Sequence, residues 1–184
     1  MRLGVLVVVV AGLVGGGVYG WGVWQDRQTA EARTPWSDAY VDVTATPSYA
    51  FENPRDDHTR NAVLAFVVAS SSDACEPSWG GAYSLDEAQQ ALDLDRRLAR
   101  FRVLGGSAMV SFGGQANSDL ALGCTDHDEL KLGYAEVVER YELSSIDMDI
   151  EGEMLADAAA VERQARAVAG LQQDRQDDDG LDVW

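Results

Sequence analysis

Three acidic residues alternate with apolar ones in the run Ser-Ile-Asp-Met-Asp-Ile-Glu at positions 145–151. On a β-strand successive side chains point to opposite faces, so Asp147, Asp149 and Glu151 share one face and the apolar residues share the other. Like charges this close raise the pKa of at least one carboxyl by about 1–3 units, which keeps a proton bound near neutral pH. A protonated carboxyl beside ionised carboxylates is the arrangement that sugar-cleaving sites use.

Two other interpretations of this acidic run are weaker. An exposed edge strand would explain the charges, but acidic residues form strands poorly, and three in alternate positions repel one another. A calcium-binding EF-hand loop that began at Asp147 would have Gly152 at its sixth position, as such loops require. It would also need a bidentate Glu at its twelfth position, where this chain has Ala158, so the spacing excludes a calcium loop.

The beginning of the chain is apolar. Residues 3–24 contain no charged side chain, and a helix that rises about 1.5 Å per residue over this length can cross a hydrocarbon core of about 30 Å. The run exceeds the usual apolar core of a signal peptide, about 7–15 residues, which favours a retained anchor, while Ala30-Glu31-Ala32 is compatible with cleavage. We expect a transmembrane or signal segment at 1–24, a polar linker at 25–37 and an extracytoplasmic domain at 38–184, either membrane-anchored or secreted.

The cysteines and the charge narrow the choice of partners. Cys75 and Cys124 form an even pair in a chain expected to be exported, which fits a disulfide, with two buried free thiols as the alternative. His58 and His127 are isolated, so the sequence predicts no metal site. The formal net charge of -17 argues against nucleic acid and against an anionic polymer, and favours a neutral or cationic ligand.

Strand-like and helix-like runs alternate after the linker. The expected strands are 39–44, 62–69, 108–112, 143–151 and 181–184, and the expected helices are 84–100, 126–141 and 154–171. Ser84 and Glu87 have the spacing of a capping box at the start of the first helix. The alternation predicts an α/β fold with parallel strands joined by right-handed crossovers. The last strand begins as the sequence stops, which we interpret as the sign of a fragment.

Two motifs together point to a family. Ser-Phe-Gly-Gly at 111–114 ends one expected strand, and the acidic run ends the next one. In this order they resemble the S-x-G-G and D-x-x-D-x-D-x-E motifs of the family 18 glycoside hydrolases, the chitinases and their relatives. The resemblance implies a (β/α)8 TIM barrel with its chemistry at the C-terminal ends of the strands. Residues 38–184 would then be a barrel truncated after about four strand–helix units.

The resemblance also implies roles for the acidic residues. Glu151 would be the general acid that protonates the leaving glycosidic oxygen. Asp149 would orient the N-acetyl group of the substrate, which acts as the nucleophile in this family, and Asp147 would support Asp149. A bridge between Cys75 and Cys124 would join the loops that follow the second and third strands.

The remaining site residues follow from the same resemblance. Ser111 would be a hydrogen-bonding group beneath the acids, while Gly113 and Gly114 would allow a close backbone approach or form a simple tight turn. Trp79 would either stack on a sugar ring or pack inside its loop. Ser144 stands where the family motif has its first Asp, and a hydroxyl cannot share a negative charge with the other acids.

The sequence therefore predicts a chitinase-like hydrolase that cleaves β-1,4-linked N-acetylglucosamine glycans by a substrate-assisted, retaining mechanism, without metal or organic cofactor. The alternatives are a non-catalytic chitin- or glycan-binding module on the same barrel, and an inactive fragment. We expect an N-acetylated polysaccharide as the partner, membrane contact through the N-terminal segment, and no nucleic acid. The Tyr and Trp that later strands supply in this family would follow Trp184, so we expect the printed sequence alone to be inactive.

Overall fold

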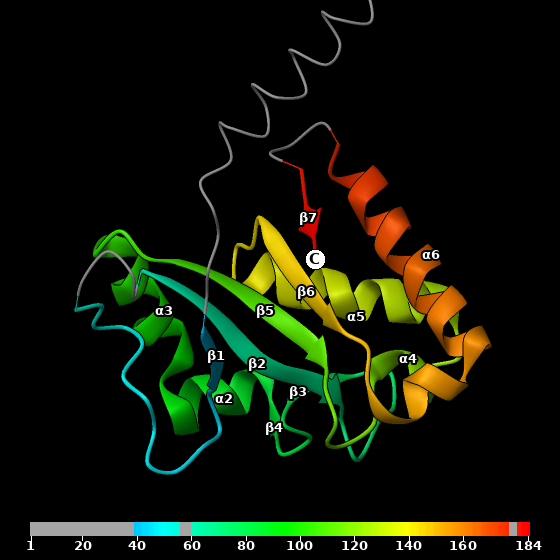
Figure 1. Ribbon diagram of the computed structural model, residues 1–184, viewed down its shortest axis with the longest axis horizontal. Helices are drawn as coiled ribbons and strands as arrows, with labels where there is room; N and C mark the ends of the chain where they lie inside the picture. The colour runs from blue at the N-terminus through cyan, green and yellow to red at the C-terminus, as the bar shows by residue number, and fades with distance from the viewer. Residues whose placement is uncertain (1–38, 56–59, 177–179) are drawn as a thin grey trace, which may run out of the picture. The chain divides into compact units, whose positions relative to one another are not determined.

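A mixed sheet forms the centre of the described part of the chain, residues 39–55, 60–176 and 180–184 of this computed structural model. The strands that pair in parallel are, in spatial order, β1 (Ala39–Asp42), β2 (Asn61–Ala69), β5 (Ser107–Gly113), β6 (Ser145–Asp149) and β7 (Asp182–Val183). Each overlaps one of the five predicted strands (Figure 1). The apolar run of β2 is buried along almost its full length, as expected for a strand that is covered on both faces. The predicted α/β arrangement is confirmed.

The structure adds a hairpin that the sequence does not predict. Strand β3 (Pro77–Trp79) pairs antiparallel with the second half of β2, and β4 (Tyr83–Ser84) pairs antiparallel with β3. The turn between them uses Gly80 and Gly81, both with positive φ, a backbone conformation that glycine adopts without steric penalty. The same edge of β2 therefore carries β1 along its first half and β3 along its second half.

The helices cover one face of the sheet (Figure 1). They are α2 (Leu85–Leu92), α3 (Leu94–Val103), α4 (Leu120–Gly123), α5 (His127–Arg140) and α6 (Ala158–Asp174), with a short 3₁₀ helix, η2 (Gly152–Ala156), before α6. The core lies between the two layers, where Leu64, Val110 and Phe112 of the sheet are fully buried together with Phe101 and Tyr134 of the helices. The other face of the sheet is left to carry the polar residues of the site.

The first predicted helix is interrupted. The capping box is confirmed, since Ser84 accepts a hydrogen bond from the backbone N–H of Glu87 while the Glu87 carboxylate accepts one from the N–H of Ser84. The single helix expected at 84–100 is nevertheless wrong, because Asp93 adopts a left-handed conformation with φ 56° and separates α2 from α3. A side-chain pattern with helical spacing persists across this break, so periodicity alone does not reveal it.

The other two helices begin at aspartate caps. Asp126 accepts hydrogen bonds from the N–H groups of Asp128 and Glu129 at the start of α5, as predicted. Asp157 accepts hydrogen bonds from the N–H groups of Ala159 and Ala160 at the start of α6. The helix expected at 154–171 therefore begins later, after η2, because Asp157 satisfies the free N–H groups of the first turn.

Trp79 lies in the core and not on the rim of the sheet. It has 0% exposed surface, its indole N–H donates to the hydroxyl of Tyr141 over 2.8 Å, and the two rings meet edge to face. The prediction that Trp79 stacks on a sugar ring is wrong, because the unpredicted hairpin folds this side chain inward. The alternative, a tryptophan packed inside the protein, is the correct one.

The structure leaves the predictions for the N-terminal part untested. The membrane or signal segment expected at 1–24 and the linker expected at 25–37 lie outside the described residues, as does His58. Within the described part, no helix has both the length and the apolar character that a membrane span requires.

The buried bond between Trp79 and Tyr141 generates a prediction about stability. Tyr141→Phe leaves the indole N–H without its partner in the core, and an unpaired buried donor costs about 1–3 kcal/mol. We expect the free energy of unfolding to fall by that amount in urea titrations. Tyr49→Phe, at a tyrosine that is 59% exposed, is the matched control and should change stability by less than about 0.5 kcal/mol. Equal effects of the two substitutions would contradict the prediction.

Candidate active site

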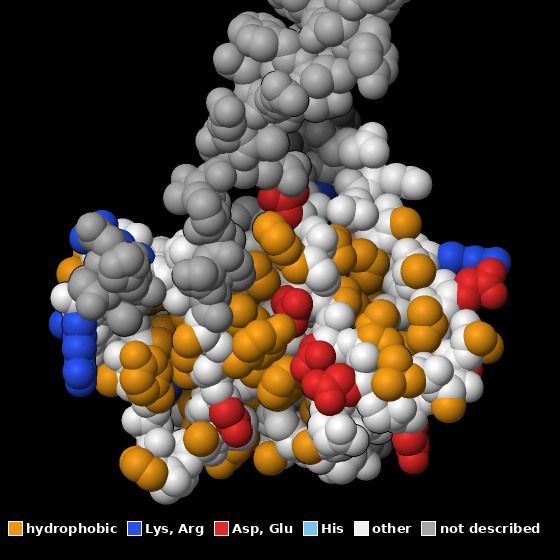
Figure 2. Space-filling model, in the orientation of Figure 1, with side chains coloured by type: hydrophobic (Ala, Val, Ile, Leu, Met, Phe, Trp, Pro, Cys, Tyr) orange, Lys and Arg blue, Asp and Glu red, His pale blue; other side chains and the backbone are white. Residues whose placement is uncertain are grey.

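The two sequence motifs lie side by side at the C-terminal ends of β5 and β6. In the parallel pairing of these strands, Ser111 is opposite Asp147 and Gly113 is opposite Asp149. Glu151 lies two residues after the end of β6 and directly precedes η2. Figure 2 shows acidic side chains in the middle of the sheet face that the helices do not cover, with hydrophobic side chains around them. The fold therefore brings the acidic residues together with Ser111, Gly113 and Gly114, whereas Trp79 lies elsewhere.

Asp147 is held by two hydroxyl donors. Its Oδ2 atom accepts a hydrogen bond of 2.6 Å from Ser111 Oγ and another of 3.0 Å from the hydroxyl of Tyr40. Ser111 is fully buried, whereas Tyr40 is more than half exposed and stacks on the ring of Phe66. These two bonds join Asp147 of β6 to β5 and to β1.

Tyr40 is a site residue that the sequence does not identify. Burial, the bond to Asp147 and the nearby carboxylates raise the pKa of Tyr40 to about 12, so its hydroxyl stays protonated and acts as a donor at neutral pH. The alternation of β1 does distinguish Tyr40 from its buried neighbour Val41. The contact between Tyr40 and Asp147 depends on the arrangement of the whole sheet. The residues next to Tyr40 in the sequence therefore do not predict it.

Asp149 is the carboxyl with the most perturbed titration. Burial raises its pKa first, followed by the charge of Glu151, a hydrogen bond shared with Glu151, and the charge of Asp147, which together bring it to about 6. The direction agrees with the prediction that one member of the group holds a proton near neutral pH. The charge of Glu151 and the hydrogen bond with it therefore both favour the protonated form of Asp149.

The two glycines of the Ser-Phe-Gly-Gly motif permit close contacts. A Cβ atom on Gly113 would lie 2.5 Å from the carbonyl oxygen of Asp149, and one on Gly114 would lie 3.0 Å from the ring of Phe66. Both glycines have positive φ, and the N–H of Gly114 donates to the carbonyl of Asp149 over 2.9 Å. Both interpretations of the motif therefore hold, since the backbone turns here and also approaches β6 closely.

Ser144 lies at the far end of β6 from Glu151. Its side chain is exposed, and its carbonyl accepts a hydrogen bond of 2.9 Å from the N–H of Asp182 at β7. The hydroxyl that replaces the first acid of the family motif is thus separated from Asp149 and Glu151 by the length of the strand.

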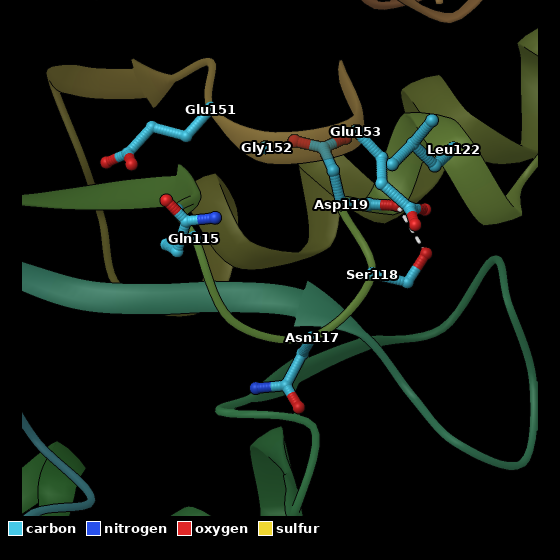
Figure 3. A pocket seen from close by; sticks show the side chains of 9 residues that line it. Gln115, Asn117, Ser118, Asp119, Leu122, Glu151, Gly152 and Glu153 are labelled. Carbon is cyan, nitrogen blue, oxygen red and sulfur yellow. Dashed lines mark hydrogen bonds between the residues drawn. The ribbon is translucent and has the colours of Figure 1, made fainter. Parts of the chain in front are cut away.

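A cavity of about 450 Å³ lies beside Glu151. The connection from β5 to α4 lines it with Gln115, Asn117 and Asp119, and the connection after β6 lines it with Glu151 and Glu153 (Figure 3). Among these side chains, only Glu151 is predicted from the sequence as a site residue. The others follow the Gly-Gly turn or the acidic run at positions where a sequence pattern does not separate a cavity wall from an ordinary loop.

Asp119 forms the buried part of the cavity wall. It is 4% exposed, caps α4 by accepting a hydrogen bond of 2.7 Å from the N–H of Ala121, and accepts a longer one from Gln164 of α6. Burial raises the pKa of Asp119, against the opposing effect of these two hydrogen bonds. This carboxyl therefore links α4 to α6 beside the cavity.

Cys75 and Cys124 are joined in a disulfide. They connect the segment between β2 and β3 to the residue after α4, where Arg163 of α6 also donates to the carbonyl of Cys124 over 2.9 Å. With Glu129 the two cysteines form the one group of three potential metal ligands among the described residues. Because the sulfurs are bonded to each other, they cannot act as thiolate ligands.

Solved chitinase structures share this fold. The catalytic domain of a hyperthermophilic chitinase from Pyrococcus furiosus matches with a TM-score of 0.64 over 78% of this chain and 45% of that chain, at 22% identity. A GH18 chitinase from Pseudoalteromonas aurantia matches with a TM-score of 0.54 over 76% of this chain and 50% of that chain, at 21% identity.

Two proteins with chitinase in their names are similar to this chain in sequence. Over 145 residues, 78% of this chain, it is 34% identical to the "Probable bifunctional chitinase/lysozyme" of Escherichia coli and 32% identical to "Endochitinase 11" of Metarhizium anisopliae. These matches support the predicted resemblance to glycoside hydrolase family 18. The chain spans 16% and 26% of the length of these two relatives. No protein-family model matches it.

The raised pKa of Asp149 generates a prediction about stability and pH. The folded pKa of about 6 lies above the usual value of 3.8, so the fold favours the protonated form. Its contribution to stability is therefore present below about pH 4 and is lost as the pH rises through about 6. Asp149→Asn has no such loss, so it should gain stability relative to the unaltered protein between pH 4 and pH 7.

Urea unfolding of both proteins at the two pH values measures this gain. Glu139→Gln, at an exposed carboxylate of α5, is the control for removal of one negative charge. A stability difference between Asp149→Asn and the unaltered protein that is the same at pH 4 and pH 7 would show that the carboxyl does not titrate as described.

Proposed function

We propose that this chain carries the acidic strand of a chitinase-like glycoside hydrolase that cleaves β-1,4-linked N-acetylglucosamine polymers. The observation that carries the proposal is the grouping of Asp147, Asp149 and Glu151 beside Ser111, where the pKa of Asp149 is raised to about 6. The names of the two curated relatives, both of which include a chitinase activity, support the same substrate class. The net charge of -17 suits a neutral or cationic polymer.

The mechanism would use two carboxyls and a nucleophile that belongs to the substrate. Asp149 orients the N-acetyl group so that its carbonyl oxygen attacks the anomeric carbon, and the bond from that carbon to the leaving oxygen breaks. Glu151 gives its proton to that oxygen as general acid. Water then attacks the anomeric carbon and returns a proton to Glu151. Two displacements at one carbon retain its configuration.

Asp147 would favour a bound proton at Asp149 and Glu151, where the mechanism uses it. Ser111 and Tyr40 both donate to Asp147 and hold its carboxylate in place. The charge of Asp147 raises the pKa of Asp149. A proton that Asp149 shares with Glu151 is then available to the leaving oxygen. Ser111 and Tyr40 are positioning residues in this scheme, because they act through Asp147.

An extracytoplasmic location is part of the proposal. The disulfide between Cys75 and Cys124 supports it, because disulfides persist mainly in oxidising compartments. The apolar run at 3–24 supports export of the chain, by a retained or a cleaved segment.

The role of Glu151 is tested by Glu151→Gln in the full-length protein. Loss of the general acid should lower kcat for an N-acetylglucosamine tetramer by about 10²–10⁴-fold, with little change in KM and an unaltered urea midpoint. Glu139→Gln again serves as the charge control and should retain full turnover. Unchanged cleavage by Glu151→Gln would refute the assignment.

A further inference from the structure

The cavity beside Glu151 has a size and position that the mechanism above does not use. Its volume, about 450 Å³, lies in the range of about 300–1,000 Å³ that is usual for small-molecule sites. In Figure 3 the Glu151 carboxylate lies to one side of the Gly152 turn, and the side chains of Asp119 and Glu153 lie to the other. The cavity is thus an extension of the site and not a part of the acidic strand.

The cavity lies on the leaving-group side of the proposed reaction. The sugar that is attacked must have its N-acetyl group at Asp149, and the oxygen of the broken bond must lie at Glu151. Glu151 lines the cavity together with the residues that follow it, Gly152 and Glu153, whereas Asp149 does not. The sugar attached through the leaving oxygen would therefore extend past Glu151 into this space.

The wall of the cavity is rich in acceptors. Its charged side chains are all carboxylates, and no Lys, Arg or His lines it among the described residues. Gln115 and Asn117 add amide groups that can bond sugar hydroxyls. The positively charged side chain of Arg163 in α6 does not line the cavity and donates to the carbonyl of Cys124. The electrostatic environment therefore favours a positively charged group.

Glu153 is the carboxylate best placed to bind such a group. Its side chain is exposed, whereas Asp119 is buried and already accepts hydrogen bonds from Ala121 and Gln164. Glu151 shares a hydrogen bond with Asp149. A new cation in the cavity would meet Glu153 first, without breaking an existing bond.

We propose, on the basis of the function proposed above, that this cavity binds the leaving-group sugar and that Glu153 makes it prefer glucosamine over N-acetylglucosamine. The ammonium group of a deacetylated residue can form an ion pair with Glu153, and a neutral acetamido group cannot. The preferred substrate is then a partly deacetylated copolymer, with an acetylated residue at Asp149 and a deacetylated residue beyond the broken bond.

Products from a partly deacetylated polymer test the two proposals separately. Each cut creates a reducing end that occupied the Asp149 side and a non-reducing end that occupied the cavity. Acetylated reducing ends are the requirement of the substrate-assisted mechanism. We expect the new non-reducing ends to be enriched in glucosamine about two- to fivefold over the polymer composition, the factor that an exposed ion pair gives. The enrichment should fall as salt is added.

Glu153→Gln should return the non-reducing ends to the polymer composition, while Glu139→Gln should keep the enrichment. Non-reducing ends at the polymer composition in the unaltered protein would overturn the preference and leave the hydrolase proposal standing. Reducing ends without acetyl groups would overturn the hydrolase mechanism.

Binding gives an independent test if cleavage is absent. The methyl glycosides of glucosamine and N-acetylglucosamine are titrated against the full-length Glu151→Gln protein at mildly acidic pH, with NMR signals of residues 115–119 as the readout. Tighter binding of the glucosamine glycoside, lost in Glu151→Gln/Glu153→Gln, supports the proposal. Equal affinities of the two glycosides would overturn it.

Discussion

Mutual repulsion among the carboxylates of β6 is the constraint on which this site depends. Asp147 and Asp149 lie on one face of a short strand and Glu151 lies just after its end. Like charges this close together destabilise the strand. Two features offset the repulsion. Ser111 and Tyr40 donate to Asp147, and the pKa of Asp149 is raised to about 6, so that it binds a proton more readily than an ordinary carboxyl. Hydrogen bonds and a raised pKa thus reduce the repulsion.

Backbone contacts also hold β6 in its position. The carbonyl of Asp149 accepts a hydrogen bond from Gly114, and Gly113 leaves no room for a side chain between the strands. The opposite face of β6 buries Ile146 in the core. Behind the strands, Asp119 connects α4 to α6, and the disulfide holds the end of α4. The acidic strand is therefore fixed from both faces and at its edge.

Features that short-range physics controls were predictable from the sequence. The capping box at Ser84 and the cap at Asp126 follow from local hydrogen bonding, and β2 follows from an uninterrupted apolar run. The acidic face of β6 follows from the period of a strand. These features depend on neighbouring residues alone and need no knowledge of the rest of the chain.

Features that depend on distant partners were not predictable. The left-handed residue Asp93 divides a helix whose apolar pattern continues through it. Tyr40 joins the site only because β1 pairs with β2 in one register, and Asp119 lines the cavity because of where α4 begins. Trp79 was assigned to two alternatives, and the hydrogen bond with Tyr141, 62 residues away, decides between them.

The buried position of Trp79 has a consequence for spectroscopy of this protein. An indole with no exposed surface and an edge-to-face tyrosine neighbour is shielded from dissolved quenchers, and its emission reports on packing of the core. Trp184, by contrast, is 60% exposed. Among the described tryptophans, a fluorescence change on adding sugar would therefore come from the end of the sheet, and loss of the shielded emission would follow unfolding.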